Sequence, residues 1–276
     1  SHPLAFFSKG DKIITPADEL HYRSEVDRII YEKKLSFSYR PIYDVNDKKI
    51  YGYMARAIPI GTSFGSIDEL KNYAIRAKDE KSLFAAIAKH LVPTFVAERM
   101  EKNHRLFLPA RMDERMLITS FFPHYNAAKE ANLTFLFKEE DIANYLDPTS
   151  IETLFKFIAT IKRNGFGFAI YLKGKALVLE RSIYEQCDAF FVDFSSRSET
   201  NMDTAIRSEL HALVERLMRY KKPIIGTNLM NWNAIELVVG SKVEYISSDS
   251  FAPYDAMFKP INSKSVDRVK GMIDRK

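Results

Sequence analysis

Residues 167–172, GFAIYL, and residues 189–194, AFFVDF, are short apolar runs that are separated by a helical pattern. Runs of the same kind recur at 105–110 (RLFLPA), 133–137 (LTFLF), 223–227 (PIIGT) and 243–247 (VEYIS). Short and nearly continuous apolar runs are typical of parallel strands that are buried on both faces. Because these runs alternate with helical patterns, the sequence predicts an α/β fold with a parallel sheet.

A β-hairpin is expected before these runs. Residues 35–45 and 50–58 read as strands on either side of the turn NDKK, and a helical pattern covers 20–34. The two hairpin strands and the six later runs make eight strands, which predicts a TIM-like (β/α)8 barrel that opens with a β-hairpin. An open doubly wound sheet is the alternative. No glycine-rich phosphate fingerprint follows any strand, which argues against a dinucleotide-binding version of that sheet.

Short signals predict where several helices begin and end. Ser66 and Glu69 have the spacing of a capping box, which favours a helix start. Asn164-Gly165 is a typical signal for the end of a helix. Pro93 is expected to kink or break the long helix that contains it, because proline has no N–H to donate.

The composition is that of a soluble globular protein. Of the 276 residues, 46% are apolar and 28% are charged, and no apolar run is long enough to cross a bilayer. Cys187 is the one cysteine, which excludes an intrachain disulfide and fits a reducing compartment. We interpret residues 1–19 as a linker or vector remnant and residues 20–276 as one barrel domain.

The net charge of +5 is modest. The basic residues are dispersed along the chain and mixed with acidic residues, so we expect a solvated surface rather than a nucleic-acid interface. We also expect this segment to make no membrane contact of its own.

Chemistry in barrels of this type is located where the strands end. The predicted strand ends are Met54-Ala55-Arg56, Pro109-Ala110, Leu136-Phe137, Tyr171-Leu172, Phe191-Val192-Asp193 and Gly226-Thr227-Asn228. None of these ends contains histidine or cysteine, and they are short of carboxylates. A site built there would have very few groups that could titrate or coordinate a metal ion.

The order and spacing of these segments resemble one known family. The segments are YRPIYDVNDKKIYGYMARA (39–57), NGFGFAIYLKG (164–174), CDAFFVDFS (187–195) and KPIIGTNLMN (222–231). They are similar to the motif segments of EAL domains, a bacterial fold best known for hydrolysing cyclic di-GMP. The resemblance covers residues 25–260, and no single motif is intact.

The resemblance implies that the family's metal-binding and catalytic positions are degenerate in this chain. Asp193 is kept. The altered positions hold Met54, Pro109, Leu136, Tyr171, Leu172, Phe191, Thr227 and Met230. Phe191 stands for the catalytic lysine, and none of the others is a carboxylate. Because Mg²⁺ and Mn²⁺ require hard, mostly anionic oxygen ligands, we expect no metal, no cofactor and no enzymatic activity.

The resemblance leaves three functional hypotheses. The leading one is a noncatalytic regulatory module that binds a protein partner or itself in bacterial signalling. We expect it in the cytoplasm, either alone or as the cytoplasmic part of a longer, membrane-anchored protein. Its candidate partner surface is the predicted loop Phe121–Tyr125, which we expect to expose apolar side chains.

The second hypothesis is a noncatalytic receptor for cyclic di-GMP or another anionic nucleotide. Its candidate ligand-binding residues are Arg40, Arg56, Lys173 and Asp193. Arg40 stands at the position of the family's guanine-contacting glutamine, and Ile58 replaces its phosphate-contacting arginine. The third hypothesis, an active phosphodiesterase, requires bound divalent metal.

Overall fold

The computed structural model describes residues 16–32, 34–147, 150–173, 176–195 and 204–273. The strands are β1 (Leu35–Asp44), β2 (Lys49–Pro59), β3 (Arg105–Ala110), β4 (Leu133–Lys138), β5 (Gly167–Leu172), β6 (Ala189–Asp193), β7 (Ile224–Thr227) and β8 (Tyr245–Ser247). The helices are α1 (Pro16–Glu32), α2 (Ile67–Ala77), α3 (Glu80–Glu98), α4 (Arg115–Phe121), α5 (Asn126–Glu130), α6 (Glu139–Tyr145), α7 (Ile151–Arg163), α8 (Arg181–Glu185), α9 (Thr204–Met218), α10 (Trp232–Gly240) and α11 (Ser263–Ile273). Two short 3₁₀ turns, η1 (Met112–Glu114) and η2 (Phe122–His124), flank α4.

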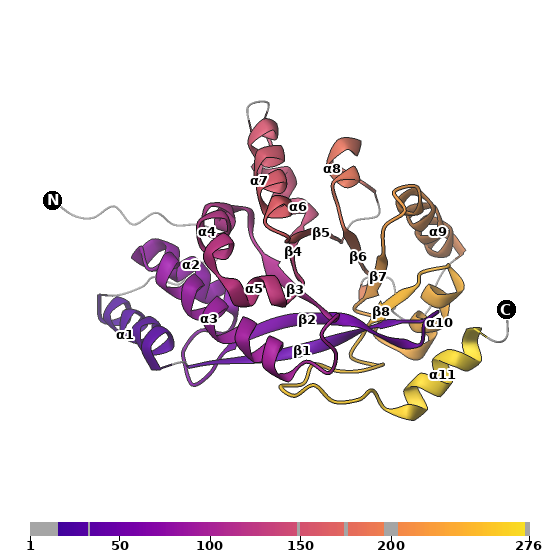
Figure 1. The fold of residues 1–276 in the computed structure, drawn as a ribbon, viewed down its shortest axis with the longest axis horizontal. Coiled ribbons are helices and arrows are strands. Elements are labelled where there is room, and N and C mark those ends of the chain that lie inside the picture. Colours follow the sequence, from indigo (N-terminus) through magenta and orange to yellow (C-terminus); the bar gives the residue numbers. More distant parts are fainter. Residues whose placement is uncertain (1–15, 33, 148–149, 174–175, 196–203, 274–276) are drawn as a thin grey trace. The chain divides into compact units, whose positions relative to one another are not determined.

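The eight strands close into a barrel in the order in which they occur in the chain (Figure 1). Strands β2 to β8 run parallel to one another, and β1 is antiparallel to β8. The predicted (β/α)8 barrel with an opening hairpin is therefore confirmed, and the alternative of an open doubly wound sheet is wrong.

The chain divides into two compact units, which are described separately. The smaller unit contains residues up to 36 together with 58–87, and the larger unit contains 37–57 and 88–276. In the smaller unit the ring of Tyr22 packs against those of Phe64 and Tyr73, at centroid distances of 5.3 and 5.6 Å. The helix expected from residue 20 begins four residues earlier, at Pro16. The assignment of 20–276 to one domain stays a prediction.

Of the three predicted signals for helix starts and ends, two are confirmed and one is wrong. The side chain of Ser66 accepts a hydrogen bond from the Glu69 N–H at 3.1 Å, so the predicted start of α2 is confirmed. Helix α7 ends directly before Asn164-Gly165, and Gly165 adopts a positive φ of 83°. The predicted break at Pro93 is wrong, because α3 continues through this residue to Glu98. Fully buried side chains on both sides of the proline, including Val92 and Phe95, hold the helix together despite the lost hydrogen bond.

Close packing between strands explains one glycine of the barrel. Gly167 in β5 lies opposite Thr134 in β4. A Cβ atom at Gly167 would lie 2.4 Å from the Thr134 hydroxyl oxygen, which is closer than a side chain can approach. The outward-facing Phe137 of β4 packs on Phe157 of α7 with ring centroids 5.7 Å apart. The strands are thus buried on both faces, as their apolar runs predict.

The prediction that Phe121–Tyr125 is an exposed apolar loop is wrong. Phe121 ends α4, and η2 holds Phe122, whose side chain is fully buried. The Phe122 ring packs against Phe135 of β4 at 5.0 Å, so it belongs to the barrel's outer core. The segment therefore does not expose the apolar patch that was expected of it.

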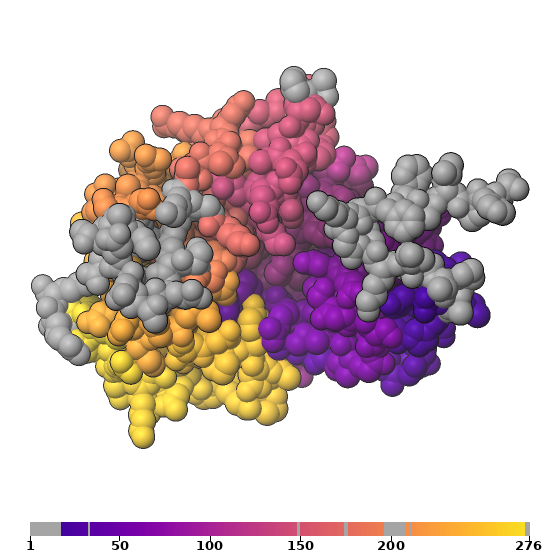
Figure 2. Space-filling view, turned by 180° about the vertical axis from the view of Figure 1, so that it is seen from behind, coloured from indigo at the N-terminus to yellow at the C-terminus, as the bar shows by residue number. Residues whose placement is uncertain are grey.

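The larger unit also contains the last two helices of the chain and its one cysteine. Helices α10 and α11 pack against each other. In the space-filling view the orange and yellow carboxy-terminal part of the chain forms one continuous surface (Figure 2). Cys187 is buried and forms no disulfide, as its apolar setting predicts.

None of the helices in the described part of the chain has the combined length and hydropathy that a membrane crossing requires.

Candidate functional site

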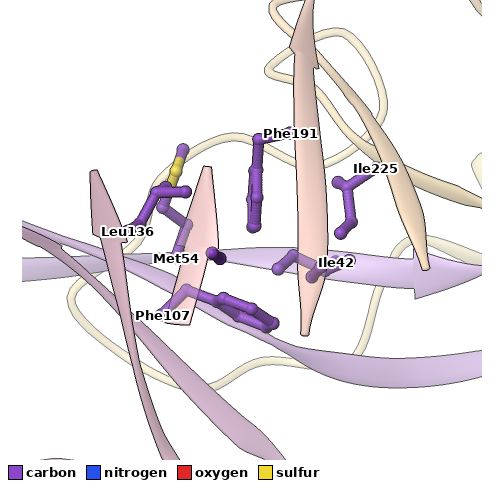
Figure 3. Packing of buried hydrophobic residues seen from close by; sticks show 8 residues of the cluster. Ile42, Met54, Phe107, Leu136, Phe191 and Ile225 are labelled. Carbon is purple, nitrogen blue, oxygen red and sulfur yellow. The ribbon is translucent and has the colours of Figure 1, made fainter. Parts of the chain in front are cut away.

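The interior of the barrel is filled by apolar side chains from seven strands. Figure 3 shows six of them converging on one another. The buried cluster consists of Ile42, Met54, Phe107, Leu136, Ala169, Ala189, Phe191 and Ile225. Phe191 has no exposed surface, and its ring meets that of Phe107 edge-on at 5.0 Å. The positions predicted to have lost the family's charged groups at 54, 136 and 191 therefore form a packed apolar layer.

A buried arginine lies at the mouth of the barrel, where the parallel strands end. The Arg40 side chain is 2% exposed and extends from β1 toward β7 and β8. Its guanidinium donates to the hydroxyl oxygens of Thr227 at 2.7 Å and Ser247 at 3.1 Å. It also donates to the amide oxygen of Asn228 at 3.4 Å. These bonds engage the guanidinium within the protein and leave few of its N–H groups for a ligand.

A second set of polar contacts surrounds Asp193 at the end of β6. Its carboxylate accepts hydrogen bonds from the Tyr171 hydroxyl at 2.5 Å, from the Asn228 amide at 3.2 Å and from the Ser195 N–H at 2.7 Å. Burial acts to raise the pKa of Asp193, but the hydrogen bonds outweigh it and lower this pKa below its usual value. Burial raises the pKa of Tyr171, and the neighbouring Asp193 raises it further, so the phenol remains a donor. Asp193 is thus an ionised carboxylate that is fully engaged by its neighbours.

Tyr254 covers this network from the segment that follows β8. The guanidinium carbons of Arg40 and Arg56 lie 4.8 and 4.2 Å from the centre of its ring, which is within cation–π range. The segment is held in place because the next residue, Asp255, exchanges two backbone hydrogen bonds with Tyr39 of β1, at 2.8 and 3.1 Å. The mouth is therefore occupied by a side chain of the protein itself.

The predicted site residues do not include Tyr254, Ser247 or Asn228, although Asn228 belongs to one of the predicted strand ends. Asn228 joins the two networks, because it accepts from Arg40 and donates to both Tyr171 and Asp193. It does so from a left-handed backbone conformation with a φ of 55°. A polar residue directly after a strand was the available signal for Asn228, whereas no local signal marks Tyr254.

The remaining predicted site residues are not part of the mouth network. Leu172 is buried but alternates with Tyr171, so its side chain lies on the opposite face of β5. Pro109 lies on the same face of β3 as Phe107 but is exposed near the end of the strand, and Met230 is 64% exposed beyond β7. Lys173 is exposed after β5. The predicted ligand-binding role of Arg40, Arg56, Lys173 and Asp193 stays a prediction.

The mouth does not fit a pair of divalent cations. No cluster of three or more histidine, cysteine, aspartate or glutamate residues that could hold a metal occurs among the described residues. At the mouth itself, Asp193 is already satisfied by three donors. The neighbouring side chains of Leu136 and Phe191 offer no oxygen atom. These residues therefore cannot supply the anionic oxygen ligands that Mg²⁺ or Mn²⁺ needs.

Another buried carboxylate, Glu139, has a structural contact. It begins α6 and accepts hydrogen bonds from the Tyr184 hydroxyl and, at 3.2 Å, from the Val178 N–H. Burial raises the pKa of Glu139, although these two bonds act in the opposite direction. Glu139 therefore fixes the chain between β5 and α8.

Comparison with solved structures identifies the fold. The Pseudomonas aeruginosa FimX EAL domain bound to c-di-GMP matches with a TM-score of 0.69 and 12% identity, over 85% of this chain and 96% of that one. The EAL domain protein from Listeria monocytogenes EGD-e matches with a TM-score of 0.64 and 11% identity, over 91% and 98% of the two chains. The chain has the fold of an EAL domain.

Two further findings complete the comparison of this EAL fold with known proteins. A standalone EAL protein from Vibrio cholerae O395, in its c-di-GMP bound form, matches with a TM-score of 0.62 and 16% identity, over 84% of this chain and 97% of that one. No protein-family model and no curated protein matches the sequence. At such low identity the likeness concerns the fold, so function has to be argued from the residues of the barrel mouth.

Proposed function

We propose that this EAL-fold chain is a noncatalytic regulatory module of bacterial signalling that acts by contact with a protein partner or with itself. The observation that carries the proposal is the apolar layer at the barrel interior, with Leu136 and Phe191 at its top. Hydrolysis of a phosphodiester by two metal ions needs anionic ligands that hold the ions and generate hydroxide. The side chains of Leu136 and Phe191 contain no oxygen and cannot act as such ligands.

The mouth network supports the same proposal. Arg40 is committed to Thr227 and Ser247, and Tyr254 lies over it. A nucleotide would have to displace Tyr254 and replace these internal hydrogen bonds, so its binding free energy would be reduced by their loss. A module with such a mouth signals through its surface instead.

A longer parent protein is part of this proposal. The chain also matches the Vibrio cholerae LapD structure that comprises S helix, GGDEF and EAL segments, where it covers 58% of that chain with a TM-score of 0.65. We place the module in the cytoplasm as one domain of such an assembly, which would transmit a signal by changing its protein contacts.

The second candidate function is a noncatalytic receptor for cyclic di-GMP. It is favoured by Arg56, which is exposed and lies 4.2 Å from the Tyr254 ring centre. An arginine stacked on an aromatic ring is an arrangement that also binds bases and phosphates. The FimX and Vibrio cholerae EAL structures named above contain bound c-di-GMP, which keeps this ligand the first one to test.

A calorimetric titration with cyclic di-GMP, with and without Mg²⁺, tests the proposal. We expect no binding heat at ligand concentrations up to about 1 mM and no linear dinucleotide product by chromatography. Micromolar binding without product would establish the receptor instead. Product formation that depends on Mg²⁺ or Mn²⁺ would overturn the noncatalytic assignment.

A further inference from the structure

The amino-terminal end of the barrel, opposite the mouth, collects basic side chains. Because strands β2 to β8 run parallel, the segments that precede them meet at one end of the barrel. Hydrogen bonds and a salt bridge between these segments show that they lie close together. Asn132 donates to the Lys102 carbonyl at 3.2 Å, Lys162 pairs with Asp188 at 3.3 Å, and the Val45 N–H donates to the Glu244 carbonyl at 2.8 Å.

Eight cations in the turns and helix ends that precede the strands at this end have no hydrogen bond or salt bridge from their side chains to another described residue. Arg105, the first residue of β3, also has none and lies over the Tyr51 ring at 5.3 Å. The eight cations come from the hairpin turn and from the segments before β3, β4, β5, β7 and β8, and we call this surface the basic end. Its members are Lys48, Lys102, Lys129, Arg163, Arg219, Lys221, Lys222 and Lys242. All of them are exposed except Lys222, which is half-buried. Basic residues that are dispersed in the sequence are thus concentrated on one surface by the closure of the barrel.

Most acids at the same end are used within the protein. Asp44 accepts hydrogen bonds from the N–H groups of Asn46 and Asp47, both at 2.9 Å. Asp188 is shared between Lys162 and the Phe168 N–H. These acids are engaged by donors of the protein itself, whereas the eight cations of the basic end have no such partner.

Three of the lysines also occupy positions where glycine is the less strained residue. Lys48, Lys221 and Lys242 have φ values of 57°, 54° and 65°, in the left-handed region. Lys221 and Lys242 follow the ends of α9 and α10, where glycine would terminate the helix with less strain. Helix termination alone therefore does not explain why lysine occupies these positions.

We infer that the basic end is the docking surface of this module and that its partner is an acidic segment of another protein. This inference rests on the proposed function, because it assigns a surface to the proposed protein contact. Six of the eight cations are lysines, which attract separate carboxylates as point charges and lack the planar fork that suits phosphate. Exposed acids, including Glu130 and Glu244, interrupt the surface and would repel a continuous phosphate chain. A protein segment can place its own basic or neutral residues opposite these acids.

Fluorescence anisotropy tests the inference with a labelled 20-residue peptide of alternating glutamate and glycine. We expect the wild-type chain to bind the peptide at 50 mM salt and to lose most of this affinity at 200 mM salt, because the charges are exposed. The variant with Arg219→Glu, Lys221→Glu and Lys242→Glu should bind at least about tenfold more weakly.

Two further variants make the result specific. Changing Lys48, Lys102 and Lys129 to glutamate should weaken binding similarly, from different loops. A matched control changes Lys81, Lys89 and Lys264 to glutamate; these residues are exposed and are not members of the basic end, and the control alters net charge equally. Affinity of the control should change by less than about threefold. Thermal melts establish that each variant is folded.

Several results would overturn the inference. These are no binding by the wild type, equal weakening in the control, or tighter binding of a 20-nucleotide oligothymidine or of phosphatidylserine vesicles through the same lysines. The nucleotide titration above is a separate measurement. A failure of peptide binding with no cyclic di-GMP binding refutes the basic end alone, whereas cyclic di-GMP binding refutes the proposed function alone.

Discussion

Replacing Arg40 by alanine separates a structural arginine from a ligand-binding one. Arg40 is 2% exposed, and its partners Thr227 and Ser247 have no exposed surface. Removal of the guanidinium leaves both hydroxyl groups without this donor inside the protein. The expectation is therefore a marked loss of folding stability, whether or not any ligand binds.

The magnitude follows from the contacts. A buried polar group that loses its partner costs about 1–3 kcal/mol, and Arg40→Ala affects two such hydroxyl groups. The salt bridge to Asp249, at 3.6 Å, adds little, because the Asp249 side chain is 66% exposed. Relief of the buried charge offsets part of the loss. A net destabilisation of about 3 kcal/mol corresponds to a fall in Tm of about 6–12 °C for a chain of this size.

Differential scanning fluorimetry or calorimetry measures this change, with Arg56→Ala as the matched control. Arg56 is exposed and loses a cation–π contact worth about 0.5–1 kcal/mol, so its Tm should fall by about 1–4 °C. An Arg40→Ala variant with a wild-type Tm would refute the structural role. If that variant also lost an affinity for cyclic di-GMP that the wild type possessed, Arg40 would be a ligand residue.

The other predictions concern buried side chains. Phe191→Ala should lower the free energy of unfolding by about 3–5 kcal/mol in urea titrations, whereas Met230→Ala, at an exposed position, should change it by less than about 0.5 kcal/mol; equal effects would contradict the apolar layer. The raised pKa of Glu139 means that the folded state binds the proton more tightly than the unfolded state, so stability contributed by protonated Glu139 is lost as pH rises. The Tm of Glu139→Gln relative to wild type should therefore increase from pH 4 to pH 7, and a constant difference would refute this. Burial raises the pKa of the Cys187 thiol well above its usual value, so Ellman's reagent should react with it only after unfolding.

The barrel could be predicted from the sequence because its strands are buried on both faces. Runs such as 133–137 and 189–194 are apolar at almost every position, which is a local signal of a parallel strand. The hairpin was predictable from a different local signal, namely two strand patterns on either side of one polar turn. Predictions failed where burial overrode a local signal. The apolar packing around Pro93 keeps α3 continuous, and the packing of Phe122 on Phe135 turns an expected loop into part of the core.

The candidate site was predictable only in part. The absence of carboxylates at Met54, Leu136 and Phe191 follows from residue identity and strand order alone. The pairing of Arg40 with Thr227 and Ser247 does not, because 187 and 207 residues separate these partners in the chain. No local pattern indicates that Tyr254 returns to the mouth, since its segment is fixed by backbone pairing with Tyr39.

By itself the sequence predicted an eight-stranded barrel and showed that the predicted strand ends hold few carboxylates. Both properties depend on residue types at positions along single strands. Only the tertiary structure decided that Arg40 is buried, that Tyr254 covers the mouth and that unpaired cations gather at the opposite end. These properties arise when closure of the sheet brings distant segments together, and side-chain periodicity within one strand carries no information about which distant residues will meet.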